Sequence, residues 1–130
     1  MTTAAPTFKK QERIVSNKLI ETLFEKGDSQ SLAAFPVRAV YATKEHTKTG
    51  APVQILISVP KKRFKHAVDR NRVKRQIRES YRKNKTIITD NVPEGKQLLI
   101  AFIWLSDRHF STDETGKRIV SLLRRMADKL

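Results

Sequence analysis

The chain has 130 residues, 38% of them hydrophobic and 31% charged, which indicates one domain with a modest core and not a disordered protein. It contains no cysteine, no apolar run near the roughly 18 residues of a transmembrane helix and no segment typical of a secretory signal, so a cytoplasmic location is expected. The net charge of +14 predicts a polyanionic partner, either nucleic acid or an anionic membrane.

The N-terminal part is predicted to form an arm followed by one helix. Residues 1–12 are small or polar, so we expect a flexible arm there and a single domain over residues 13–130. Ser16 or Asn17 can cap a short helix that ends near Gly27. The apolar face of this helix is predicted to consist of Leu19, Ile20, Leu23 and Phe24.

Two strands are expected next. Residues 35–42 (FPVRAVYA) alternate between two faces, with Pro36 near the start of the strand or on a sheet edge. Residues 53–59 (VQILISV) alternate strictly after a polar turn, which predicts a second strand antiparallel to the first. The pattern also allows a short additional strand near Thr43 or Gln54.

The densest charge lies in the basic block, which we define as residues 61–85 (KKRFKHAVDRNRVKRQIRESYRKNK). Its twelve Lys or Arg and two acids give it a net charge of +10. A helix over residues 68–83 would place Val73, Ile77 and Tyr81 on one arc and guanidinium groups on the next. The basic block is therefore predicted to lie on the sheet with its Arg-rich side exposed, where guanidinium groups can bind phosphate bidentately.

The basic block has other interpretations. A solvated charged face without a ligand is one, but a charge of +10 beside an apolar stripe favours polyanion binding. A membrane-surface helix would need a broader apolar face, so no membrane partner is expected. Charge alone does not separate RNA from DNA. Asn71 can read a base edge, hold a metal-bound water or bond locally to the backbone near the helix start.

The C-terminal third supplies a buried strand and a closing helix. Residues 97–105 (QLLIAFIWL) are nearly all apolar, which predicts a strand buried on both faces. Ser111, Thr112 or Asp113 can cap the last helix. The expected order is α-β-β(-β)-α-β-α, an α+β fold with a single small sheet packed by helices. The core stripe of the last helix is predicted to be Ile119, Leu122, Leu123, Met126 and Leu130.

No residue pattern predicts a catalytic or metal site. The three histidines lack metal-ligand spacing, and capping or loop solvation explains the acids between residues 107 and 114. With only four glycines the chain has no Gly-rich phosphate loop.

The middle of the basic block resembles a family signature. Lys61-Lys62 is followed by Ala67-Val68-x-Arg70-Asn71-Arg72-x-Lys74-Arg75-x-x-Arg78-Glu79. This pattern is similar to that of the bacterial ribonuclease P protein subunit, and the order of the expected elements matches over about residues 8–128. A ribosomal or other structural RNA-binding protein would explain the charge and the fold equally well, but not the Arg-Asn-Arg window. Co-purification with a ribozyme-sized RNA or with ribosomal particles would separate the two.

The resemblance implies an activity and partners. The RNA subunit of such an enzyme is the endoribonuclease, which removes the 5′ leader of precursor tRNA with Mg²⁺ bound by the RNA. The protein carries no catalytic side chain and no evident metal; it binds the ribonuclease P RNA and the leader, and no stable protein partner is implied. The implied fold resembles a ribosomal-protein domain with a left-handed crossover.

The resemblance also implies site residues and shows departures. The leader cleft corresponds to Phe24, Arg38 and Asn71, and Phe24 is otherwise an ordinary core residue. Family members often have Gly in place of Lys65, and an aromatic residue where this chain has Ile20 or Arg38. The residues expected to contact the catalytic RNA are Lys61, Lys62, Arg70, Asn71, Arg72, Lys74, Arg75, Arg78 and Arg82.

Overall fold

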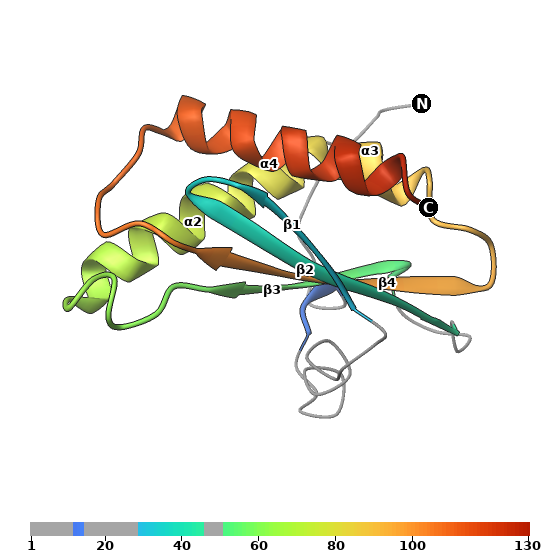
Figure 1. The fold of residues 1–130 in the computed structure, drawn as a ribbon, viewed down its shortest axis with the longest axis horizontal. Helices are drawn as coiled ribbons and strands as arrows, with labels where there is room; N and C mark the ends of the chain where they lie inside the picture. Colours follow the sequence, from blue (N-terminus) through green and yellow to red (C-terminus); the bar gives the residue numbers. More distant parts are fainter. Residues whose placement is uncertain (1–11, 15–28, 46–50) are drawn as a thin grey trace, which may run out of the picture.

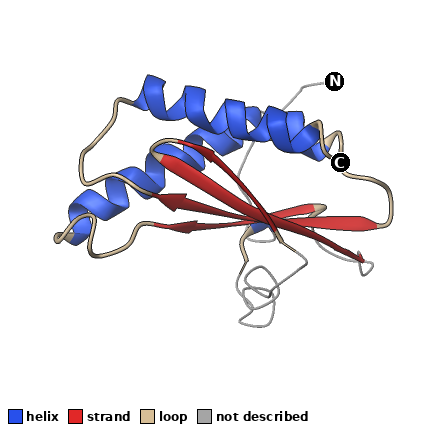
Figure 2. Ribbon diagram, in the orientation of Figure 1, coloured by secondary structure: helices blue, strands red, loops and turns tan. Residues whose placement is uncertain are grey.

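The computed structural model describes residues 12–14, 29–45 and 51–130, which form one four-stranded sheet with its helices on one face (Figure 1, Figure 2). The predicted first helix, with Phe24 and Ile20, lies outside the described residues. The strands are β1 (Gln30–Ala34), β2 (Val37–Glu45), β3 (Val53–Ser58) and β4 (Lys96–Trp104). The helices are α2 (Ala67–Asn84), α3 (Thr86–Thr89) and α4 (Thr112–Ala127).

β4 is the central element of the fold. It pairs antiparallel with β2 and parallel with β3, so that the strand order is β1-β2-β4-β3. Phe102 and Trp104 belong to the main core with the helices, whereas Leu99 and Ala101 pack on the other face with Val40. The prediction that this strand is buried on both faces is confirmed, because its nearly continuous apolar sequence supplies side chains to both layers.

Residues 35–42 and 53–59 run antiparallel, as predicted, but they do not pair with each other. β2 and β3 are both neighbours of β4 and lie on opposite sides of it. The parallel pairing of β3 with β4 requires a crossover, which α2 and α3 provide. A strand whose side chains are apolar on both faces is buried most completely when another strand lies on each side of it, which explains why β4 separates β2 from β3. The left hand of the crossover stays a prediction.

The first predicted strand is in fact part of a hairpin. Phe35 and Pro36 form the turn between β1 and β2, so the strand begins at Val37 and not at Phe35. The additional strand is β1, which lies before the turn and not near Thr43 or Gln54. Pro36 has no N–H to donate to a ladder, which favours the turn over a paired position.

Both long helices match the sequence predictions. In α2, Val73, Ile77 and Tyr81 are fully buried against the sheet. α4 is capped by Ser111, whose Oγ accepts a hydrogen bond of 3.0 Å from the backbone N of Glu114. The expected core stripe of α4 is buried except for Leu130, which is half-buried after the helix end. The single turn of α3 has no counterpart in the predictions.

Candidate nucleic-acid interface

The outer side of α2 presents the central residues of the family signature. Asn71, Arg72 and Arg75 are exposed, and they lie on the arc opposite Val73 and Ile77. Among the described residues, none of these three side chains is engaged in a hydrogen bond or an ion pair. Because the apolar arc is fixed in the core, α2 holds these polar groups in a defined orientation toward solvent.

A second group of cations lines a shallow groove beside α2. Lys74 and Arg78 are half-buried, and they share this groove of about 230 Å³ with Arg13. Its apolar wall includes Ile55 and Ile57 of β3. The groove therefore combines positive charge with an aliphatic surface, the chemistry that suits a phosphate attached to a sugar or a base.

Arg70 differs from the other arginines because its guanidinium turns toward the protein. Its Nη1 donates to the backbone oxygens of Phe64 at 2.8 Å and of Lys65 at 2.9 Å. These bonds tie the loop before α2 to the first turns of the helix. Arg70 is therefore a residue that positions this loop, beyond the phosphate-binding role expected from the sequence.

We expect Arg70→Ala to lower the free energy of unfolding by about 1–3 kcal/mol, because two charge-assisted hydrogen bonds are lost. Denaturant unfolding followed by circular dichroism measures this effect. Arg72→Ala is the matched control, since Arg72 is exposed on the same helix and should change stability by less than about 0.5 kcal/mol. Equal stability of the two variants would contradict the positioning role of Arg70.

The loop that carries Lys61 and Lys62 is also held from the β4–α4 connection. The ring of Phe64 stacks on the ring of His109 with a centroid distance of 4.5 Å. His109 Nε2 lies 3.0 Å from Asp69 Oδ1 in the first turn of α2. Lys61 and Lys62 themselves are exposed, so the loop is fixed while its charges face solvent. No local sequence signal marks this role of His109.

Arg82 is the one predicted RNA-binding residue with a carboxylate partner among the described residues. Its Nε lies 2.6 Å from Glu79 Oε2. The hydrogen bond from Arg82 holds the pKa of Glu79 below its ordinary value, and the nearby charges of Lys83 and Arg78 act in the same direction. Glu79 thus stays ionised at neutral pH and neutralises part of the charge of Arg82.

The structure does not bring together the described residues of the expected leader cleft. Arg38 lies on the face of the sheet away from α2, opposite Ile103 of β4, and its Nε donates to Ser31 Oγ at 2.8 Å. Asn71 lies on α2 and therefore on the other side of the sheet. Phe24 is outside the described residues. The joint role of these three residues stays a prediction.

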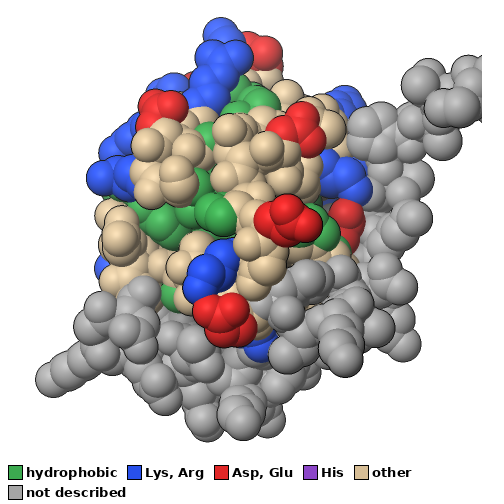
Figure 3. Space-filling view, turned by 90° about the vertical axis from the view of Figure 1, so that its right-hand side faces the viewer, with side chains coloured by type: hydrophobic (Ala, Val, Ile, Leu, Met, Phe, Trp, Pro, Cys, Tyr) green, Lys and Arg blue, Asp and Glu red, His purple; other side chains and the backbone are tan. Residues whose placement is uncertain are grey.

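The positive charge is not spread evenly over the molecule. Seen from the end where α3 and the C-terminus lie, acidic and basic side chains alternate around hydrophobic ones (Figure 3).

Within residues 12–14, 29–45 and 51–130, no group of three His, Asp or Glu side chains could hold a metal ion. No described helix has the length and apolar character needed to cross a bilayer.

The fold and this surface define a class, a small α+β protein with an exposed basic helix anchored on one face of its sheet. The sequence matches the family Ribonuclease P over residues 8–126. The ribonuclease P protein component of Porphyromonas gingivalis is 41% identical over 108 residues, which cover 81% of this chain and 77% of that protein. That of Chlorobium phaeobacteroides is 35% identical over 111 residues, covering 78% and 74% of the two chains.

Solved structures agree on the fold. The RNase P protein of Staphylococcus aureus superposes with a TM-score of 0.63 at 23% identity, covering 88% of this chain and 94% of that one. The RNase P protein of Thermotoga maritima gives a TM-score of 0.61 at 20% identity, covering 88% and 96%. The chain belongs to the ribonuclease P protein family, whose members are subunits of an endoribonuclease.

Proposed function

We propose that this protein binds the catalytic RNA of ribonuclease P through α2 and the loop before it, and that it binds the 5′ leader of precursor tRNA. The RNA subunit cleaves the leader with Mg²⁺ that the RNA holds, and the protein supplies binding and orientation. The observation that carries this proposal is the exposed set of Asn71, Arg72 and Arg75 on a helix whose opposite arc is fully buried.

The fixed position of α2 on the sheet explains why its exposed side chains can bind a folded RNA well. The buried contacts of Val73 and Ile77 fix α2 on the sheet before any RNA arrives. Binding then requires ordering of the exposed side chains but no further ordering of the α2 backbone, which lowers the entropic cost. Arginine also loses less conformational entropy per hydrogen bond than lysine, because its planar guanidinium group holds its donors in a fixed geometry.

The sheet face away from the helices is the proposed leader surface. Arg38 is exposed there, and Ile103 and Leu56 pack on that face while remaining half-buried. A guanidinium group beside aliphatic side chains can bind a backbone phosphate or stack on an unpaired base. The leader is single-stranded, so both kinds of contact are accessible to it.

We expect the reconstituted ribonucleoprotein to bind precursor tRNA more tightly than mature tRNA, and Arg38→Ala to reduce that preference. A lost contact of about 1–3 kcal/mol corresponds to roughly a 5- to 150-fold weaker binding of the precursor. Dissociation constants for both tRNAs, measured by filter binding, provide the test. Lys129→Ala is the control, since Lys129 is exposed beyond the end of α4. Equal affinity of the unmodified complex for both tRNAs would contradict leader binding.

A further inference from the structure

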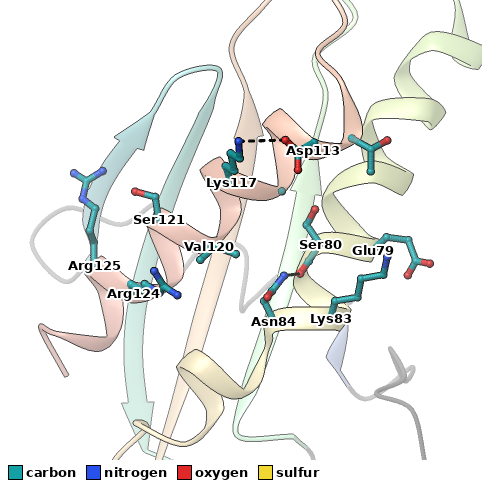
Figure 4. Close-up of a pocket in the computed structure, with 12 residues that line it drawn as sticks. Glu79, Ser80, Lys83, Asn84, Asp113, Lys117, Val120, Ser121, Arg124 and Arg125 are labelled. Atoms are coloured by element: carbon teal, nitrogen blue, oxygen red, sulfur yellow. Dashed lines mark hydrogen bonds and ion pairs between the residues drawn. The ribbon is translucent and has the colours of Figure 1, made fainter.

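A groove between α2 and α4 forms a second hollow on the helical layer (Figure 4). Its volume is about 660 Å³. Small side chains bring the two helices close at its base: a Cβ on Gly116 of α4 would lie 3.4 Å from Ser80 Oγ of α2. Longer side chains from both helices then form its rims.

One rim is part of the helix that carries the proposed RNA-binding face. Lys83 lies on α2 one turn beyond Glu79, and Arg124 lies across the groove on α4 (Figure 4). On the projection of α2, Lys83 falls next to Arg72, so both lie on the same side of the helix, with Glu79 between them along its axis.

The charges in the groove do not cancel. The two acids that line it already have cationic partners, because Asp113 lies 3.2 Å from Lys117 Nζ and Glu79 lies 2.6 Å from Arg82. Among the described residues, neither Lys83 nor Arg124 has a carboxylate within ion-pair distance. Lys83 is nevertheless near enough to Glu79 to help lower the pKa of that carboxyl.

Polar groups at the base complete the surface. Ser121 of α4 and Asn84 of α2 line the groove, and Asn84 is oriented by a bond of 2.8 Å from its Nδ2 to the backbone oxygen of Ser80. Hydroxyl and amide groups beside cations are the usual contacts of backbone phosphates in nucleic-acid complexes.

We propose that Lys83 and Arg124 bind backbone phosphates of the same RNA that α2 holds, so that the RNA-binding surface spans both long helices. This inference rests on the proposed function. It adds α4, which lies outside the family signature, as a second row of phosphate contacts. RNA is the occupant that the observations favour, because the groove has an excess of cationic side chains and one of its rims belongs to the helix that carries the proposed RNA-binding face.

Arg124→Gln tests this directly in binding to a bacterial ribonuclease P RNA over a series of salt concentrations. We expect the slope of log K against log salt to fall by about 0.7–0.9, the value for one phosphate contact, and the affinity to fall several-fold at low salt. Lys129→Gln removes an equal charge beyond the groove and should leave the slope unchanged. Lys83→Gln should reproduce the effect from the opposite rim.

The outcomes separate this inference from the proposed function. If Arg75→Ala lowers the slope and both Arg124→Gln and Lys83→Gln leave it unchanged, the groove does not bind the RNA and the role of α2 stands. If Arg75→Ala also has no effect, the proposed function itself fails. Inorganic phosphate that shifts the amide resonances of Ser121 and Asn84, together with unchanged RNA binding by Arg124→Gln, would identify a site for free phosphate and overturn the proposal. Thermal unfolding verifies that each variant is folded.

Discussion

Replacing Arg72 and Arg75 together by alanine is expected to weaken binding of the catalytic RNA by at least about a hundredfold. Each guanidinium is exposed and unengaged among the described residues, so each is available for a charge-assisted bond that contributes about 1.5–3 kcal/mol. The same double variant should lower the slope of log K against log salt by about 1.4–1.8, because the loss of two phosphate contacts reduces the number of counterions released on binding. Filter binding at several salt concentrations measures both quantities.

The fold should be unaffected by this double change, since neither side chain contributes to the core. Lys129→Ala, which removes one positive charge away from α2, is the comparison and should bind RNA with nearly normal affinity. A double variant that keeps the full salt slope would show that α2 turns another face to the RNA. A variant that loses affinity at unchanged slope would point to base contacts without phosphate contacts.

Ile77→Ala is expected to lower the free energy of unfolding by about 2–5 kcal/mol. Ile77 is fully buried between α2 and the sheet, so the substitution removes apolar contacts and leaves a cavity. For a domain whose total stability is roughly 5–15 kcal/mol, this loss would leave much of the protein unfolded at elevated temperature. Urea denaturation followed by circular dichroism measures the change.

Val68→Ala provides the comparison on the same helix, because Val68 is 75% exposed and should change stability by about 0.5 kcal/mol or less. Saturating catalytic RNA should raise the apparent stability of Ile77→Ala, since a ligand that binds only the native state shifts the equilibrium toward it. Similar stability of the two variants would show that α2 is not anchored by this arc.

The elements were more predictable from the sequence than their pairing. Alternation and helical periodicity depend on neighbours a few residues apart, and they located β3, β4, α2 and α4 closely. One of the two partners of β2 is β4, which lies about sixty residues away, and no local sequence pattern predicts that pairing. The apolar character of both faces of β4 was the one available sign that it occupies the centre of the sheet.

In the basic block, too, local periodicity predicts which residues are buried but not which tertiary contacts they make. Periodicity correctly predicts that Val73 and Ile77 are buried and that Arg75 is exposed. Arg70 was predicted only to contact RNA, although it projects between Ile77 and Tyr81 on the helix and is half-buried in the structure. Its acceptors, the carbonyls of the preceding loop, and the stacking of Phe64 on His109 depend on tertiary structure alone.

The proposed function is tested most directly by reconstitution with a bacterial ribonuclease P RNA at near-physiological Mg²⁺. Cleavage of a precursor tRNA is measured with RNA alone, with protein alone and with both. We predict that protein alone is inactive and that adding it to the RNA strongly accelerates release of the 5′ leader. Robust cleavage by the protein without RNA, or an RNA whose activity the protein does not change, would contradict the proposal.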